Sequence, residues 1–93
     1  MSSTPARYGF PNPADPVAHD MPSIRYAGED IAVRLEVRRA EDGAWRGRLL
    51  FASPDATSRS TAEIFFAPNE ADLWQSVREV GIHHVRDLYR SLL

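Results

Sequence analysis

The sequence predicts an α+β domain, in which three or four antiparallel strands form a meander and one C-terminal helix packs on one face of the sheet. Three observations favour this fold class. Five of the seven prolines fall within residues 1–22. Apolar and polar residues alternate strictly over residues 31–39, which is typical of a half-buried strand. Apolar residues recur at helical spacing over residues 70–92. We therefore expect a proline-rich arm, residues 1–22, followed by a small α+β domain, residues 23–93.

The predicted arm is extended or irregular, because each proline fixes its own φ angle and disfavours helix in the residue before it. Tyr8 and Phe10 make it more apolar than a simple spacer. Two interpretations are open: a disordered leader, or an arm that lies along this domain or a neighbour with Tyr8 and Phe10 as anchors. After the arm, residues 23–27 are expected to form a short edge strand, and residues 28–30 to turn the chain.

The clearest strand, residues 31–39, is followed by a second alternating strand over residues 44–52. Inward residues must pair with inward residues, because a slip of one residue turns every side chain to the other face. A two-residue loop would place an apolar residue opposite an arginine. We therefore predict a three-residue loop with Gly43 in the left-handed conformation, which sets Leu35 opposite Leu49. By the same register, Val33 lies opposite Phe51, Glu36 opposite Arg48, and Arg38 opposite Arg46.

The third predicted strand covers residues 59–67. Its alternation places Ala62, Ile64 and Phe66 on the core face. Pro68 follows and ends the strand, because proline has no backbone N–H to donate.

A single helix is predicted over residues 70–92, with Asn69 as its N-cap and acidic residues in its first turn. The apolar stripe runs through Gly81 without a change of phase. One interpretation is that Gly81 lets the helix approach the sheet closely, with Gly47 as its counterpart on the second strand. The preferred interpretation is that each glycine is a simple packing notch. The alternative is two helices, the first of which ends at Gly81.

The outer face of the predicted sheet is rich in arginine, and carries Arg34, Arg38, Arg46 and Arg48. Arg38 opposite Arg46 is a like-charge pair, which is unfavourable unless an anion lies between them. Three explanations are open: Glu63 neutralises the cluster, an acidic protein surface binds there, or nucleic acid binds through its phosphates. Leu50 and Phe65 are predicted on the same face, and an apolar pair ringed by arginines favours a protein interface.

Composition and motifs exclude several classes of function. The net charge is −2, so nothing draws the whole chain toward nucleic acid or anionic lipid, and there is no cysteine for a disulfide or a thiolate metal site. No apolar run exceeds four residues, and the N-terminus does not resemble a signal peptide, so we expect a cytoplasmic protein. Nucleophile elbows and phosphate-binding glycine loops are missing. We therefore expect no enzymatic activity, no cofactor and no small-molecule substrate.

A metal site on the helix is a weaker hypothesis. Glu79, His83 and Asp87 share one face of the predicted single helix at four-residue spacing. Such a triplet would hold a divalent metal only weakly, since first-row metal sites usually contain more histidine or cysteine.

The sequence thus favours a non-enzymatic protein–protein interaction module, an accessory subunit or regulator that acts through its arm and its arginine-rich outer face. Its expected partner is another protein or a second copy of the chain, because a core of this size is marginal alone. The first alternative is a nucleic-acid-binding regulator using the same arginines, and the second is a weak metal-binding protein.

Overall fold

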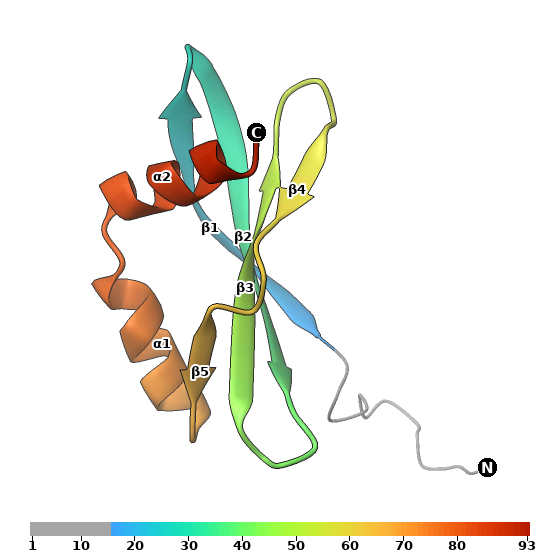
Figure 1. Ribbon diagram of the computed structural model, residues 1–93, viewed down its shortest axis with the longest axis vertical. Coiled ribbons are helices and arrows are strands. Elements are labelled where there is room, and N and C mark those ends of the chain that lie inside the picture. Colours follow the sequence, from blue (N-terminus) through green and yellow to red (C-terminus); the bar gives the residue numbers. More distant parts are fainter. Residues whose placement is uncertain (1–15) are drawn as a thin grey trace, which may run out of the picture.

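The computed structural model describes residues 16–93, and within them the chain forms five strands and two helices (Figure 1). In chain order these are β1 (Val17–Tyr26), β2 (Glu29–Arg39), β3 (Trp45–Ala52), β4 (Ser58–Ser60), β5 (Phe65–Ala67), α1 (Glu70–Glu79) and α2 (Ile82–Ser91). Tyr8 and Phe10, the predicted anchors of the arm, lie outside the described residues.

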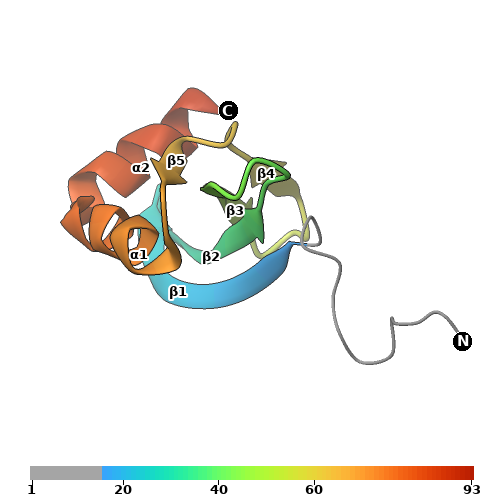
Figure 2. The same cartoon turned by 90° about the horizontal axis from the view of Figure 1, so that it is seen from below.

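The strands form one antiparallel sheet in the order β1-β2-β3-β4, and β5 pairs with the other half of β3. The sheet is strongly twisted, and both helices lie on one side of it (Figures 1 and 2). This confirms the predicted α+β class and the antiparallel meander. The structure adds a fifth strand, and it replaces the single predicted helix with two.

The β2–β3 hairpin has the predicted register. Leu35 lies opposite Leu49, and Arg38 lies opposite Arg46. The backbone N–H of Ala40 donates to the carbonyl of Ala44 at 2.8 Å, which closes a loop of three residues. Gly43 in this loop has a φ of 86°, the left-handed conformation that favours glycine.

The first strand begins earlier than predicted, at Val17, so residues 17–22 of the expected arm belong to the sheet. The pairing of β1 with β2 shifts register between Met21 and Ile24. Pro22 lies in this bulge, where a residue without a backbone N–H is tolerated on an edge strand.

The third predicted strand is interrupted. Residues 61–64 separate β4 from β5. Two residues of β3 lie between Gly47, which pairs with Phe65, and Leu50, which pairs with Ser60. Four residues lie between Ser60 and Phe65 on the other segment. Thr61 holds this break together. Its N–H donates to the Leu49 carbonyl at 3.0 Å, and its hydroxyl accepts from the Leu49 N–H at 3.1 Å.

The third strand turns the opposite set of side chains to the core from the set predicted. Phe65 is 6% exposed and lies in the core, so the prediction that it lies on the outer face is wrong. Ile64 and Phe66, predicted inside, are exposed. The two extra residues do not change the phase, because they are an even number: Arg59 lies opposite Phe51 and Phe65 opposite Gly47, both on the inner face of β3. The prediction failed because it turned the even-numbered residues of this segment inward, whereas the odd-numbered residues of β5 face the core.

The predicted single helix breaks at Val80 and Gly81, both of which have extended backbone angles. As predicted, Asn69 caps α1, and its side-chain oxygen accepts from the Asp72 N–H at 2.8 Å. Gly81 is exposed, and a Cβ built on it would meet nothing within 4 Å. Both interpretations of Gly81, a close approach to Gly47 and a packing notch, are therefore wrong. Gly47 instead lies against the side chains of Leu35 and Phe65.

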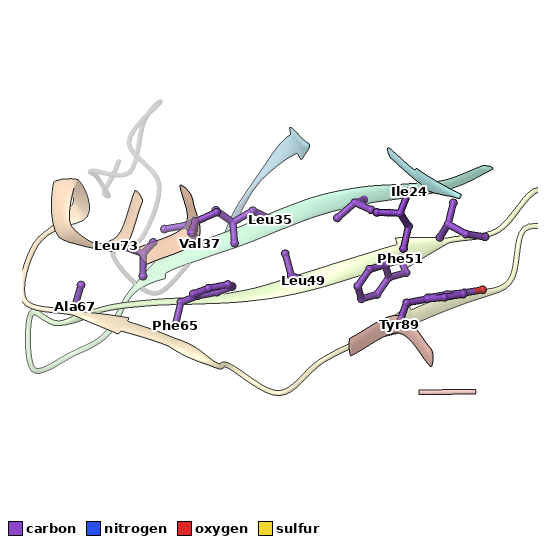
Figure 3. Packing of buried hydrophobic residues seen from close by; sticks show 12 residues of the cluster. Ile24, Leu35, Val37, Leu49, Phe51, Phe65, Ala67, Leu73 and Tyr89 are labelled. Atoms are coloured by element: carbon purple, nitrogen blue, oxygen red, sulfur yellow. The ribbon is translucent and has the colours of Figure 1, made fainter. Parts of the chain in front are cut away.

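The core lies between the sheet and the two helices, and it extends along β2 and β3 (Figure 3). At one end, Leu73 of α1 packs with Val37, Phe65 and Ala67. At the other end, Tyr89 of α2 packs with Phe51 and Ile24. Leu35 and Leu49 lie between these two groups (Figure 3).

Candidate functional site

The outer face of the sheet, on the side away from the helices, carries the even-numbered residues of β2 and β3. Arg34, Arg38, Arg46, Arg48 and Leu50 all belong to this face, as predicted from the sequence. Phe65 does not belong to it, because its side chain is buried under α1 and α2.

Glu63 provides the anion that the Arg38–Arg46 pair requires. Its two carboxylate oxygens accept from Arg38 Nε at 2.5 Å and from Arg38 Nη2 at 2.9 Å. Both side chains are less than one third exposed. These hydrogen bonds lower the pKa of the Glu63 carboxyl below its ordinary value, although burial acts in the opposite direction. Nearby Arg46 and Arg48 lower it further. The same hydrogen bonds raise the pKa of Arg38.

The other arginines of this face also have carboxylate neighbours. Arg48 Nε donates to Glu36 at 2.7 Å, and Arg34 Nε lies 3.2 Å from the carboxylate of Asp20. The face is therefore a mosaic of ion pairs rather than an uncompensated positive patch. Of the three explanations for the arginine cluster, neutralisation by acidic residues of the chain is the one that this geometry supports.

Arg46 is the least well paired of the four arginines. Its guanidinium lies 3.9 Å from Asp42, and its Nε is buried without a hydrogen-bond partner among residues 16–93. The guanidinium carbon lies 5.2 Å from the centre of the Phe66 ring, within the range of a cation–π contact. The Phe66 side chain is itself 58% exposed.

We call Phe66, Ile64 and Arg46 the Phe66 patch. Ile64, two residues before Phe66 on the edge segment, is 40% exposed, and of the two apolar side chains Phe66 is the one in contact with Arg46. Aromatic residues and arginine are the residue types that most often contribute strongly to protein interfaces.

Leu50 lies in a separate part of the outer face, opposite Arg34 on one side and Ser60 on the other. It is half-buried at the base of an open hollow of about 370 Å³. Small residues of three strands, two arginines and Phe51 also line the hollow: Ala32 and Arg34 of β2, Phe51 and Ala52 of β3, and Ser58, Arg59 and Ser60 of β4. The outer face thus combines a projecting aromatic ring with a hollow.

Phe66 and Ile64 are site residues that sequence reasoning placed on the wrong face. Residues 64–67 form a continuous apolar run, Ile-Phe-Phe-Ala, whose alternation is compatible with either face. Glu63 was a misleading signal, because in an unbroken strand an outward Glu63 also places Phe65 outward. Glu63 contacts Arg38 while Phe65 is buried because residues 61–64 leave the regular strand.

The predicted metal-binding face does not form. Glu79 is the last residue of α1, whereas His83 and Asp87 belong to α2, so the three residues do not share a helix face. Residues 16–93 contain no group of three histidine, aspartate or glutamate side chains placed to hold a metal ion. Asp87 instead pairs with Arg90 at 3.0 Å.

The displaced pKa values in the described chain belong to groups held in their charged forms. Besides Arg38 and Glu63, the carboxyl of Asp55 has its pKa lowered to about 2 by a hydrogen bond from the Ser53 hydroxyl and by hydrogen bonds from Thr57. Asp55 thereby orders the loop between β3 and β4. A general acid or base works best with a pKa near the operating pH, and these groups have shifted away from it.

In the part of the chain that the structure describes, neither helix has the length and hydropathy needed to cross a bilayer. No protein-family model, no curated protein and no solved structure matches this chain.

Proposed function

We propose that the chain is a non-enzymatic protein-interaction module, an accessory subunit or regulator, whose contact surface is the outer face of the sheet. The observation that carries this proposal is Phe66, an aromatic side chain 58% exposed on a sheet face and in contact with Arg46. Burying such a ring against a partner gains about 1.5–3 kcal/mol from removal of apolar surface.

The ion pairs of the outer face favour a protein partner over nucleic acid. Affinity for phosphates depends on cationic side chains that displace counterions from the nucleic acid. Here Arg38 and Arg48 donate to carboxylates of the same chain, and those carboxylates would repel phosphate. A nucleic-acid partner thus remains the weaker alternative.

The sheet edges favour contact through side chains rather than strand addition. Along one edge, β1 carries the Pro22 bulge, and along the other, β4 and β5 have only three residues each. Bulges, proline and short edge strands are the features by which proteins discourage pairing with another strand. A partner is therefore expected on the outer face of the sheet, around the Phe66 patch.

A second copy of the chain is the first partner to test. The hollow at Leu50 is larger than a phenylalanine side chain, and it lies on the same face as Phe66. In a two-fold dimer each contact occurs twice. If Phe66 of one copy enters the hollow of the other, the second Phe66 therefore enters the hollow of the first. Two sheets packed face to face in this way are a common arrangement.

The experiment combines light scattering after size-exclusion chromatography with affinity capture from the native host. We expect a dimer, or one captured protein, that is lost in Phe66→Ser and retained in Leu93→Ser. Leu93 is a matched control because it is 58% exposed, as Phe66 is, but follows α2 at the C-terminal end of the described residues. A monomer that captures nothing, or a complex insensitive to Phe66→Ser, would contradict the proposal.

The predicted role of Tyr8 and Phe10 as anchors needs its own variant. Deleting residues 1–15 leaves β1 intact, whereas deleting residues 1–22 would remove half of that strand. If the arm contributes to the interface, the shorter deletion weakens association while leaving the thermal midpoint of the protein unchanged.

A further inference from the structure

The inner side of the domain contains a second site, independent of the outer face. A cavity of about 360 Å³ lies where the chain passes from α1 to α2. Its floor is formed by Ile24, Val33, Leu49 and Phe65, which come from four different strands. The remaining lining residues are Met21, Pro22, Val77, Arg78, Val80, Ile82 and Val85.

The cavity follows from the way in which the helices divide the sheet. α1 packs on β5 and β3, whereas α2 packs on β1. α2 is further tied to the strands by two hydrogen bonds, from Arg86 to the Arg25 carbonyl and from Arg59 to the Leu92 carbonyl. The extended link at Val80 and Gly81 joins the two helices over the middle of the inner face (Figure 1).

The lining determines the chemistry of a ligand. Ten of the eleven side chains are apolar, and nine of those are aliphatic or proline. Ligand sites commonly have volumes of about 300–1,000 Å³ and are mostly apolar, with few polar groups. A dry apolar cavity of about 150 Å³ admits benzene, so this one has room for a chain of roughly ten carbons.

Arg78 is the single charged residue of the lining. Its Nη2 donates to the neutral side chain of Gln75 at 3.1 Å, and it forms no ion pair with any carboxylate of residues 16–93. Arg39, Arg59 and Arg86 of the described residues also form no such pair, but Arg78 is the one among these four that lines the cavity. A carboxylate matches a guanidinium with free donors, because the two can form a pair of parallel hydrogen bonds.

We propose that this cavity binds an unbranched aliphatic carboxylate, with the alkyl chain between the helices and the carboxylate on Arg78. The hydrocarbon fills space that is lined by apolar side chains. The head group remains at the exposed end, where α1 finishes.

The test is a titration of the full chain, with labelled methyl groups, by decanoate, decanol and decylamine, followed by NMR. Decanoate is expected to give saturable shifts in the methyl groups of Val77, Val80 and Val85, and to bind more tightly than decanol. Arg78→Gln should weaken decanoate about tenfold, as expected for loss of a hydrogen-bonded charge. It should leave decanol unchanged. The control Arg90→Gln, an exposed arginine elsewhere on the helices, should alter neither.

A second variant tests the cavity itself. Val80→Phe fills part of the space and should weaken decanoate and decanol alike. The proposal is overturned if decanoate gives no saturable shifts, if decylamine binds as tightly as decanoate, or if the shifts map to the Phe66 patch. It is also overturned if the cavity methyl groups respond to a protein partner but not to decanoate, because the occupant is then a protein side chain.

Discussion

Glu63 is the residue on which the charge balance of the outer face depends. It lies in a segment without regular strand pairing, yet it provides both oxygens to Arg38 and lies near Arg46 and Arg48. Without Glu63, the cross-strand pair of Arg38 and Arg46 would be an uncompensated repulsion.

Glu63→Gln is therefore predicted to lower the free energy of unfolding at pH 7. A carboxyl whose pKa is lowered by folding stabilises the protein above its unfolded pKa of about 4.3. This stabilisation is lost as the pH falls through the lower, folded pKa. The difference between the native chain and the variant should thus be full at neutral pH and vanish in acid, as measured by urea unfolding.

Glu79→Gln is the matched control, because Glu79 forms no ion pair with other residues in the range 16–93. A stability difference for Glu63→Gln that persists unchanged at pH 3, or one no larger than that of the control, would show that the Arg38–Glu63 pair is not the cause.

At the same scale, the sequence predicted the faces of most strand residues but not of Phe65 and Phe66. Arg34 and Arg48 alternate with apolar neighbours, so their side chains had only one plausible face. In the run of residues 64–67, both alternations bury apolar side chains, so periodicity does not decide between them.

At the scale of elements, the β2–β3 hairpin followed from the sequence because two physical constraints agreed. Inward pairing fixed the register, and Gly43 fixed the loop length. The division into β4 and β5 did not follow from the sequence, because it depends on one side chain. The Thr61 hydroxyl accepts the hydrogen bond from the Leu49 N–H in place of a backbone carbonyl, and hydrophobic periodicity does not indicate such a bond.

The helix break was likewise hidden. The apolar stripe keeps its phase across Gly81, so periodicity alone predicts one continuous helix about 33 Å long. One straight helix covers only part of a strongly twisted sheet, whereas two shorter helices can each align with the strands on which they pack (Figure 1). Tertiary packing thus overrides the local pattern at Val80 and Gly81.

Thr61→Val tests the account of the strand break. The side chain is 7% exposed, and valine keeps its shape but removes the acceptor of the Leu49 N–H. Leaving a buried donor without a partner costs about 1–3 kcal/mol. We expect that loss in chemical unfolding, and a smaller one for Thr61→Ser, which keeps the hydroxyl. Equal losses for the two variants would mean that the methyl group, not the hydrogen bond, matters.

At the scale of the whole molecule, the two faces of the sheet have different roles. The inner face holds the core and the apolar cavity between the helices, and the outer face presents a neutral mosaic of ion pairs with an exposed aromatic ring. The sequence placed Arg34, Arg38, Arg46, Arg48 and Leu50 on the outer face, where the structure has them. It named Phe65 instead of Phe66, and it gave no sign of the cavity, whose existence depends on the helix break.

The most direct test of the proposed interface is site-specific photo-crosslinking in the native host, with benzoylphenylalanine at position 66. Position 93 is the matched control, because Leu93 and Phe66 are both 58% exposed. We predict a discrete covalent adduct, to a second copy or to one partner protein, from position 66 and not from position 93. No adduct at position 66, or the same adducts from both positions, would contradict the assignment of the outer face as a protein interface.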